Sequence, residues 1–249
     1  MQKTHSETFI VRGTDCDLYR RMRLDRLFIA MQEGGEQHAQ ALGFGYDAMM
    51  ARGLFFVLSR IHVSIARMPR SGETVVHTTW PGVCNRFFCP RYHTFSLEDG
   101  TPLASVGALW VILDTENRKI VSPASASLPF PDNSDIPTPV SLPMRAPAPA
   151  SGGESFLRTP VFSEFDVNGH VNNTKYIAWL CDALGRQALD GQFICDLTAS
   201  YEKEIRSEAP RTLTLSCDGS RFSFLVAGED CAKNFTASGT LQKEVVCHE

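Results

Sequence analysis

Apolar residues recur at helical spacing in two separate stretches of the chain. The first stretch has one face made of Leu24, Leu27, Phe28, Met31, Gly35, His38 and Leu42. The second has one face made of Tyr176, Ile177, Leu180 and Leu184, in phase with Asn173. Each pattern predicts an amphipathic helix with one buried face. Asn172 or Asn173 is the expected N-cap of the second helix, and Gly43 is the expected stop of the first.

The first predicted helix carries three unusual residues. Gly34 and Gly35 lie in its interior, where a glycine costs about 1 kcal/mol relative to alanine. We therefore expect both glycines to pack closely against a sheet. His38 falls on the apolar face, and we interpret it as a core histidine with satisfied hydrogen bonds rather than a catalytic residue.

Runs of β-branched and aromatic residues surround each predicted helix and indicate antiparallel strands. In the first half, a strand-like run over 7–15 is followed, after the helix, by Leu54–Ala66, Thr74–Trp80, Arg86–Leu97 and Leu103–Leu113. In the second half, Arg158–Val161 precedes the helix, and Asp196–Ile205, Thr212–Cys217, Arg221–Ala227 and Asn234–Leu241 follow it. Hairpin turns are expected at Asp99-Gly100, Asp218-Gly219 and Gly228-Glu229-Asp230.

A proline-rich segment separates the two halves. Eight of the fourteen prolines fall within 123–149, which has neither helical nor strand periodicity. This composition predicts an extended linker. We therefore predict an N-terminal domain over 1–128, a linker over 129–152 and a C-terminal domain over 153–249.

The order of elements is the same in both halves, and the segments that precede the two helices align. Asp17 matches Asp166, Tyr19 stands where Asn168 does, and Arg21 stands where His170 does. One competent site and one degenerate copy is the simplest explanation. The alternative is a coincidence between two short segments that each lead into a helix.

Composition narrows the class of protein. The chain has 249 residues, 43% of them hydrophobic and 21% charged, and a net charge of −4. This charge argues against non-specific binding to nucleic acid. The start of the chain has no apolar signal core, and no stretch is long enough to cross a membrane. We predict a cytoplasmic protein whose eight cysteines are reduced, with no metal because no cluster has ligand spacing.

The candidate chemistry lies in the stretch Phe165-Asp-Val-Asn-Gly-His-Val-Asn-Asn173. Five of these nine side chains carry a carboxylate, a carboxamide or an imidazole, groups that are costly to bury without partners. They precede a helix whose positive end favours a negative charge or a polarised carbonyl.

This stretch, continued to Tyr176, resembles the Asp-x-Asn-x-His-Val-Asn-Asn-x-x-Tyr signature of acyl-acyl carrier protein (acyl-ACP) thioesterases. The resemblance implies an α+β protein with two tandem hotdog domains, each a long helix wrapped by an antiparallel β-sheet. It also implies a bacterial-type member that hydrolyses fatty acyl-ACP in fatty acid biosynthesis, without a cofactor. Part of the signature also occurs in single-hotdog acyl-CoA thioesterases.

The family has a further site segment, Tyr-x-x-Glu-Cys, on the strand after the helix. Here it reads Tyr201-Glu202-Lys203-Glu204-Ile205. Glu204 matches the family's glutamate, whereas Ile205 excludes a cysteine nucleophile at that position.

Asp166, Asn168, His170 and Glu204 are the predicted catalytic residues. Asp166 or Glu204 is the expected base toward water, with Asn168 and His170 orienting the reactants and backbone N–H groups near Asn172 binding the oxyanion. Attack by Asp166 to form an anhydride is an alternative. The structural alternative for Asp166 is a capped turn, and for Glu204 it is a solvated strand position or an ion pair, since Glu202 and Glu204 would share one face of the strand.

The substrate requires an apolar tunnel and a docking surface. The predicted substrate-binding residues are Asn172, Asn173, Tyr176 and Trp80. Further tunnel candidates in the first domain are Leu54-Phe-Phe-Val57, Phe87 and Trp110, although aromatic residues on strands are usually plain core. Carrier proteins are acidic, so the docking candidates are basic: Arg20, Arg21, Arg23, Arg26, Lys203 and Arg206.

We therefore predict an acyl-ACP thioesterase that is a monomer or homodimer and does not bind nucleic acid or membranes. The alternatives are an acyl-CoA thioesterase of the same fold and a non-catalytic acyl-binding protein.

Overall fold

The structure, a computed structural model, describes residues 2–150, 152–229 and 231–244. The chain divides into two compact units, Met1–Pro143 and Met144–Glu249. The division falls inside the proline-rich segment. Within the described ranges, the structure contains no helix with the length and apolar character needed to cross a membrane.

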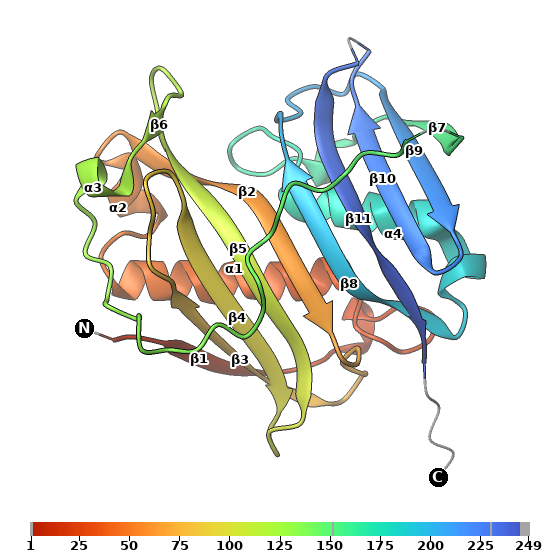
Figure 1. Ribbon diagram of the computed structural model, residues 1–249, viewed down its shortest axis with the longest axis horizontal. Helices are drawn as coiled ribbons and strands as arrows, with labels where there is room; N and C mark the ends of the chain where they lie inside the picture. The colour runs from red at the N-terminus through yellow and green to blue at the C-terminus, as the bar shows by residue number, and fades with distance from the viewer. Residues whose placement is uncertain (1, 151, 230, 245–249) are drawn as a thin grey trace. The chain divides into compact units, whose positions relative to one another are not determined.

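The first unit consists of one long helix, an antiparallel sheet and several short elements. Its elements are β1 (His5–Ile10), a 3-10 turn (Gly13–Asp15), α1 (Leu24–Ala41), α2 (Tyr46–Met50), β2 (Leu54–Ile65), β3 (Thr74–Pro81), β4 (Cys89–Leu97), β5 (Pro102–Asp114), β6 (Ile120–Val121) and α3 (Pro123–Ala126). The strands are ordered β1-β3-β4-β5-β2, with β6 paired to β5. Helix α1 packs against β1 and β3 on one face of this sheet (Figure 1).

The second unit repeats this arrangement. Its elements are β7 (Glu154–Arg158), a 3-10 turn (Phe162–Glu164), α4 (Asn173–Leu189), β8 (Gln192–Tyr201), β9 (Arg211–Asp218), β10 (Arg221–Ala227) and β11 (Lys233–Lys243). The strands are ordered β7-β9-β10-β11-β8, which matches the first unit strand for strand. Helix α4 packs against β8 and β9. The protein is therefore α+β, with each sheet built from antiparallel pairs.

The buried helix faces agree with the sequence prediction. All seven predicted positions of α1 and all four of α4 are buried. Gly34 and Gly35 pack against the sheet as expected: a Cβ at Gly34 would lie 2.6 Å from His77 Cε1, and one at Gly35 would lie 3.5 Å from Arg91 Cδ. Helix α1 ends at Ala41, and Gly43 follows with φ of +84°, so the predicted stop is confirmed.

The predicted strand-like run over 7–15 is wrong at its end, because β1 stops at Ile10 and Gly13–Asp15 forms a 3-10 turn. Three further strands differ from the prediction by more than two residues. Strand β4 begins at Cys89 rather than at Arg86, because the Asn85 carboxamide accepts hydrogen bonds from the backbone N–H groups of Phe87 and Phe88 and forms a turn. Strand β7 covers Glu154–Arg158, so the predicted strand at Arg158–Val161 is wrong. The backbone N–H of Val161 donates instead to the Glu164 carboxylate, at 3.0 Å.

The third difference concerns the predicted site. Strand β8 ends at Tyr201, so the prediction of a strand through Ile205 is wrong. The backbone N–H groups of Glu202 and Lys203 both donate to the Asn234 carbonyl oxygen, and the chain then leaves the sheet. Glu204 lies on this following segment, and Glu202 and Glu204 do not share a strand face.

The proline-rich segment is anchored along its length. It contains one short helix, α3, which the sequence did not predict; its N-cap is Ser122. Buried Asn133 donates to the Lys3 and Pro81 carbonyl oxygens, at 3.0 and 2.8 Å. Further along, the backbone N–H of Ala146 donates to Ser200 Oγ at 3.0 Å. The last predicted turn, Gly228-Glu229-Asp230, includes residue 230, which lies outside the described residues.

The internal repeat is confirmed by hydrogen bonds in the loops before α1 and α4. Asp17 and Asp166 each accept from the backbone N–H groups two and four residues further on. The backbone N–H of Arg23 donates to the Asp15 carbonyl oxygen, as that of Asn172 donates to Glu164. Coincidence between two short segments does not explain such a match.

Candidate active site

The loop before α4 is a capped turn built by Asp166. Asp166 Oδ1 accepts from the backbone N–H groups of Asn168 and His170, at 2.8 and 3.3 Å. The Asp166 N–H donates to the His170 carbonyl oxygen at 2.8 Å. Gly169, at φ of +71°, allows this tight path. These bonds fix the backbone at His170 and leave the Asn168 side chain exposed.

Glu164 holds this loop against α4. Its buried carboxylate accepts from Trp179 Nε1 at 2.8 Å, from the Val161 N–H at 3.0 Å, and from the Arg158 guanidinium. Burial opposes ionisation, but these hydrogen bonds outweigh it and lower the pKa of Glu164. Sequence reasoning missed Glu164. The signal that could have found it is its alignment with Asp15, which also forms an ion pair, with Arg26 at 3.4 Å.

His170 and Glu204 come together although 34 positions separate them in the sequence. His170 Nε2 lies 3.4 Å from Glu204 Oε2, and Arg206 Nη2 lies 2.9 Å from the same oxygen. The two segments are joined by a backbone hydrogen bond of 2.9 Å from Val171 N to the Ile205 carbonyl oxygen. Both side chains are partly exposed, at 15% for His170 and 28% for Glu204. Solvent or a substrate can therefore reach the pair.

The N-terminus of α4 is occupied by its own cap. Asn172 Oδ1 accepts from the Thr174 N–H at 3.0 Å and from the Thr174 hydroxyl at 2.7 Å, so Asn172 is confirmed as the N-cap. The Asn172 N–H donates to the Glu164 carbonyl oxygen at 2.9 Å. The Asn172 N–H itself therefore already has a partner, and oxyanion binding by the other backbone N–H groups at this helix start stays a prediction.

Two tyrosines, Tyr176 and Tyr201, fix the start of α4 by packing and hydrogen bonding. Tyr176 is buried and stacks on Phe235, with ring centroids 5.1 Å apart. The Tyr201 hydroxyl donates to the Asn173 carbonyl oxygen at 3.1 Å. Burial raises the pKa of both tyrosines, so both remain protonated hydrogen-bond donors. These contacts place Tyr176 and Asn173 in the framework of the site, and their contact with substrate stays a prediction.

The equivalent loop in the first unit lacks the acid–base pair. Arg21 replaces the histidine, and its guanidinium binds the Asp17 carboxylate of the same turn at 2.9 Å. Met22 N donates to the Pro69 carbonyl oxygen just as Val171 N donates to Ile205. By this correspondence Met68 occupies the place of Glu204. The first unit therefore has the same turn as the second but lacks the histidine and the glutamate.

The predicted arginine cluster offers little free positive charge. Arg21 is only 3% exposed, so its prediction as a docking residue is wrong. Arg23 lies 3.3 Å from Asp25, and Arg26 lies 3.4 Å from Asp15. In the second unit, Lys203 and Arg206 are exposed, and Arg206 is paired with Glu204. In the first group, Arg21, Arg23 and Arg26 are thus paired with nearby aspartates, whereas Arg20 is exposed.

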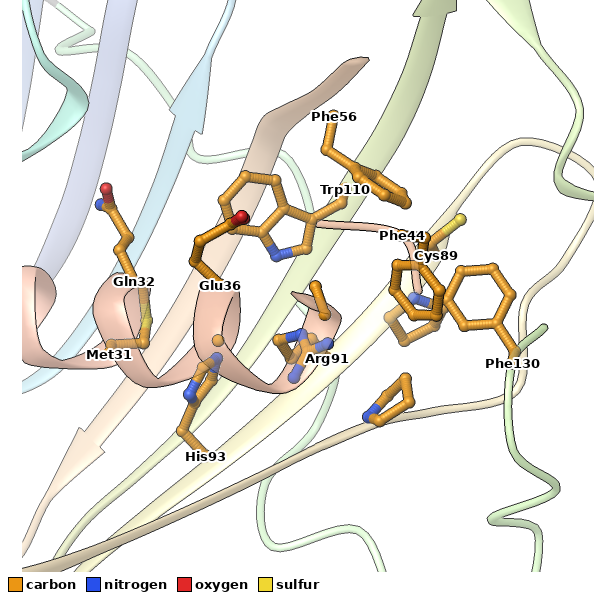
Figure 2. Close-up of a pocket in the computed structure, with 14 residues that line it drawn as sticks. Met31, Gln32, Glu36, Phe44, Phe56, Cys89, Arg91, His93, Trp110 and Phe130 are labelled. Carbon is orange, nitrogen blue, oxygen red and sulfur yellow. The ribbon is translucent and has the colours of Figure 1, made fainter. Parts of the chain in front are cut away.

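The first unit contains a pocket between α1 and the sheet (Figure 2). Phe56 and Trp110, both predicted tunnel residues, are among its lining residues. Trp80 is instead buried beside Tyr92 and does not line this pocket, and Phe87 is 46% exposed. Phe44 packs with Phe130 and Phe56 at one end, with ring centroids 4.8 and 6.1 Å apart.

His38 is fully buried, as predicted. Its Nε2 lies 3.2 Å from the Gln2 carbonyl oxygen, and its Nδ1 lies 3.3 Å from Arg91 Nη1. Burial and the adjacent Arg91 charge lower the pKa of His38 to about 4. His38 is therefore a neutral core residue near pH 7.

No metal centre is apparent in the part of the chain that the structure describes: no three His, Cys, Asp or Glu side chains are grouped to hold an ion. The seven described cysteines are free thiols, and Cys247 lies outside the described residues.

Comparison with known proteins identifies the family. The sequence matches the acyl-ACP thioesterase N-terminal domain over residues 2–125 and the acyl-ACP thioesterase C-terminal domain over 154–223. A chloroplastic acyl-[acyl-carrier-protein] hydrolase of Cuphea viscosissima is 25% identical over 86% of this chain and 55% of its own length. A dodecanoyl-[acyl-carrier-protein] hydrolase of Cinnamomum camphora is 26% identical over 88% and 61%. The chain thus spans less than two thirds of the length of these relatives.

Solved structures share the fold. An acyl-ACP thioesterase from Bacteroides thetaiotaomicron superposes with a TM-score of 0.84 at 20% identity, covering 96% of this chain and 98% of that one. The 12:0-ACP thioesterase of Umbellularia californica gives 0.80 at 23% identity, covering 97% and 94%. Because the two domain matches together span most of the sequence, the chain belongs to the acyl-ACP thioesterase family.

Proposed function

We propose that this chain hydrolyses the thioester of fatty acyl-ACP and releases a free fatty acid in fatty acid biosynthesis. The observation that carries the proposal is the His170–Glu204 pair, at 3.4 Å, formed within the family's characteristic motif. Family membership supports the substrate class.

In the proposed mechanism, His170 is the general base in place of the carboxylates expected from the sequence, and Glu204 orients it, because the two side chains lie 3.4 Å apart. His170 takes a proton from water, and the resulting hydroxide adds to the thioester carbonyl carbon. Glu204, which Arg206 holds at 2.9 Å, stabilises the imidazolium. The carbon–sulfur bond then breaks, and the leaving thiolate takes the proton back from His170. Thiol and carboxylic acid are the balanced products.

Asp166 and Asn168 have supporting roles in this proposal. Asp166 Oδ1 already accepts two backbone hydrogen bonds in the turn, which favours a positioning role over nucleophilic attack. Asn168 is exposed beside His170 in the sequence, and its carboxamide is suited to orient water or the thioester carbonyl. Ile205, buried where the family has cysteine, supports a mechanism without a thiol nucleophile.

We propose further that the two units are tandem hotdog domains. Each has one long helix against an antiparallel sheet, with the same strand order in both. In this proposal the first domain, over 1–128, takes the acyl chain in its pocket, and the second, over 153–249, performs the hydrolysis. The cytoplasmic location and the oligomeric state stay predictions from the sequence.

The test measures thiol release from acyl-ACP and acyl-CoA substrates of increasing chain length. His170→Ala and Glu204→Gln should each lower kcat/KM by about 10²-fold or more. The double variant should lose little more than either single variant, because the two groups act as a unit. Glu208→Gln is the matched control, because Glu208 is an exposed glutamate four positions further along the sequence, and it should leave activity unchanged.

Faster release from the carrier-bound substrate supports the proposal, and faster release from acyl-CoA would identify the alternative thioesterase. Absence of thiol release from either substrate class, with acyl chains still bound, would leave an acyl-binding protein.

A further inference from the structure

The loop between β3 and β4 continues the antiparallel pairing of these two strands. The backbone N–H of Gly82 donates to the Pro90 carbonyl oxygen at 2.9 Å, and that of Asn85 donates to the Phe88 carbonyl oxygen at 3.0 Å. Residues 83 and 84 lie between these hydrogen bonds on one side of the loop, whereas residue 89 alone lies between them on the other side. Residues 83 and 84 therefore both stand opposite residue 89, as in a β-bulge.

The side chains of Cys84 and Cys89 share one face of this loop. Val83 is 65% exposed, whereas Cys84 packs against the same apolar cluster that contains the buried Cys89. Residues that stand opposite each other in an antiparallel pair have Cα atoms about 4.5–5.5 Å apart. A disulfide needs about 4.4–6.8 Å between its Cα atoms. The backbone of this loop therefore holds the two cysteines at a spacing that a disulfide can bridge.

The two thiols interact directly and differ in acidity. The Cys89 thiol donates a hydrogen bond to the Cys84 sulfur, which lowers the pKa of Cys84 although burial opposes the shift. The same hydrogen bond, together with burial, raises the pKa of Cys89. Cys84 is also partly exposed, whereas Cys89 is buried. Because the thiolate is the reactive form of cysteine, Cys84 is the nucleophile of the pair and Cys89 is the thiol that can bond to it afterwards.

The pair lies at the wall of the pocket between α1 and the sheet. Cys89 lines this pocket and stands opposite Trp110, another lining residue, in the register of β4 and β5. Figure 2 shows Cys89 at the same end of the pocket as Phe44 and Phe130. A bond between the two sulfurs therefore forms in the pocket wall.

We propose that Cys84 and Cys89 form a reversible disulfide when the protein meets a peroxide, which makes this part of the pocket wall a site of thiol oxidation. The Cys84 thiolate attacks one oxygen of hydrogen peroxide and the O–O bond breaks, giving Cys84 sulfenic acid and hydroxide. The hydroxide takes up the proton that Cys84 had released. The Cys89 sulfur then displaces the sulfenic oxygen, which leaves with the Cys89 proton as water.

The reaction balances: two thiols and one hydrogen peroxide give one disulfide and two water molecules, and the two sulfurs together lose two electrons. A dithiol reductant returns both thiols by exchange. The proposal does not depend on the proposed hydrolysis of acyl thioesters. It agrees with the cytoplasmic location predicted from the sequence, because cytosolic disulfides are usually transient and serve catalysis or redox sensing.

The experiment treats the full chain with hydrogen peroxide, blocks the remaining thiols with an alkylating reagent and digests the protein with trypsin. Trypsin cleaves after Arg86, which lies between the two cysteines, so they fall on separate peptides, 71–86 and 87–91. Mass spectrometry should find these two peptides joined after peroxide treatment and separated again after treatment with dithiothreitol. Oxidation of the exposed Cys217 without formation of the joined peptide overturns the proposal.

Two variants assign the roles of the two thiols. In Cys89→Ser, Cys84 should remain as a sulfenic acid that a 1,3-diketone reagent traps. In Cys84→Ser, oxidation of Cys89 should be about 10-fold or more slower than formation of the disulfide in the parent. Oxidation of Cys89 at the parental rate in this variant would contradict the proposal.

Cys217→Ser is the matched control, because it removes an exposed thiol of the second unit, and the joined peptide should form in it at the parental rate. The peptide map of the parent chain decides the proposal even where Cys89→Ser fails to fold.

Discussion

At the scale of the residue, positions 20 and 169 adopt the same left-handed backbone conformation but carry different amino acids. Both lie in the turn that precedes a long helix, and both have positive φ, +65° for Arg20 and +71° for Gly169. A side chain in this left-handed region costs about 1–2 kcal/mol, whereas glycine adopts it freely. The first copy thus retains strain that the copy with His170 lacks.

This difference gives a matched pair of variants. Gly169→Ala should lower the free energy of unfolding by about 1 kcal/mol; its Cβ would have no heavy atom within 4 Å, so the effect reports backbone strain alone. Arg20→Gly should be neutral or stabilising by up to about 1 kcal/mol. Urea unfolding measures both, and a Gly169→Ala variant as stable as the parent would contradict the argument.

At the scale of the element, α1 lies close to the sheet because of its two interior glycines. The two positions are not equivalent. A Cβ at Gly34 would overlap Glu7 Oε1 and lie 2.6 Å from His77 Cε1, whereas a Cβ at Gly35 would meet Arg91 Cδ at an ordinary 3.5 Å. The hydrogen bond between the Glu7 carboxylate and His77 Nδ1 therefore leaves no room for a side chain at position 34. Position 35 has room for a Cβ.

Alanine at each position should have opposite effects. Gly34→Ala should destabilise the protein by about 1–3 kcal/mol through overpacking against the buried hydrogen bond. Gly35→Ala should be tolerated or stabilising by up to about 1 kcal/mol, because alanine is the better helix former. Thermal unfolding of the two variants beside the parent measures the difference. Equal destabilisation by both would mean that the sheet side chains do not set the helix distance.

At the scale of the whole molecule, buried neutral histidines make stability depend on pH. The pKa of His38 is lowered to about 4 by burial, and burial also lowers the pKa of His77 and His93. Above pH 6.5 these histidines are neutral in both the folded and the unfolded chain, so their full contribution to stability is present. As the pH falls below 6.5, the unfolded chain binds protons that the folded chain does not.

The free energy of unfolding should therefore fall as the pH is lowered from 6.5 toward 4. The slope is about 1.4 kcal/mol per pH unit for each histidine that titrates only in the unfolded chain. Urea unfolding between pH 6.5 and 5 isolates this effect, since carboxylates titrate mainly below that range. A flat profile over this interval would show that the histidines accept protons in the folded state.

Some features of this protein follow from the sequence alone. The two long helices, their buried faces, the Asn172 cap and the repeat of Asp17 at Asp166 are predictable because they depend on residues within a few positions of one another. The Asp166–His170 turn belongs to the same class, since its hydrogen bonds span only four residues. Local spacing determines such contacts.

Only the tertiary structure decided which distant groups meet. The approach of Glu204 to His170 depends on β8 ending at Tyr201 and on the hydrogen bond between Val171 and Ile205. The hydrogen bonds that join Glu7 to His77 and His77 to His93 depend on the register of three strands. Arg21 became buried because Asp17 binds its guanidinium. These contacts depend on pairing between strands and loops far apart in the sequence, and no local pattern of hydrophobic and polar residues encodes which partner each group will meet.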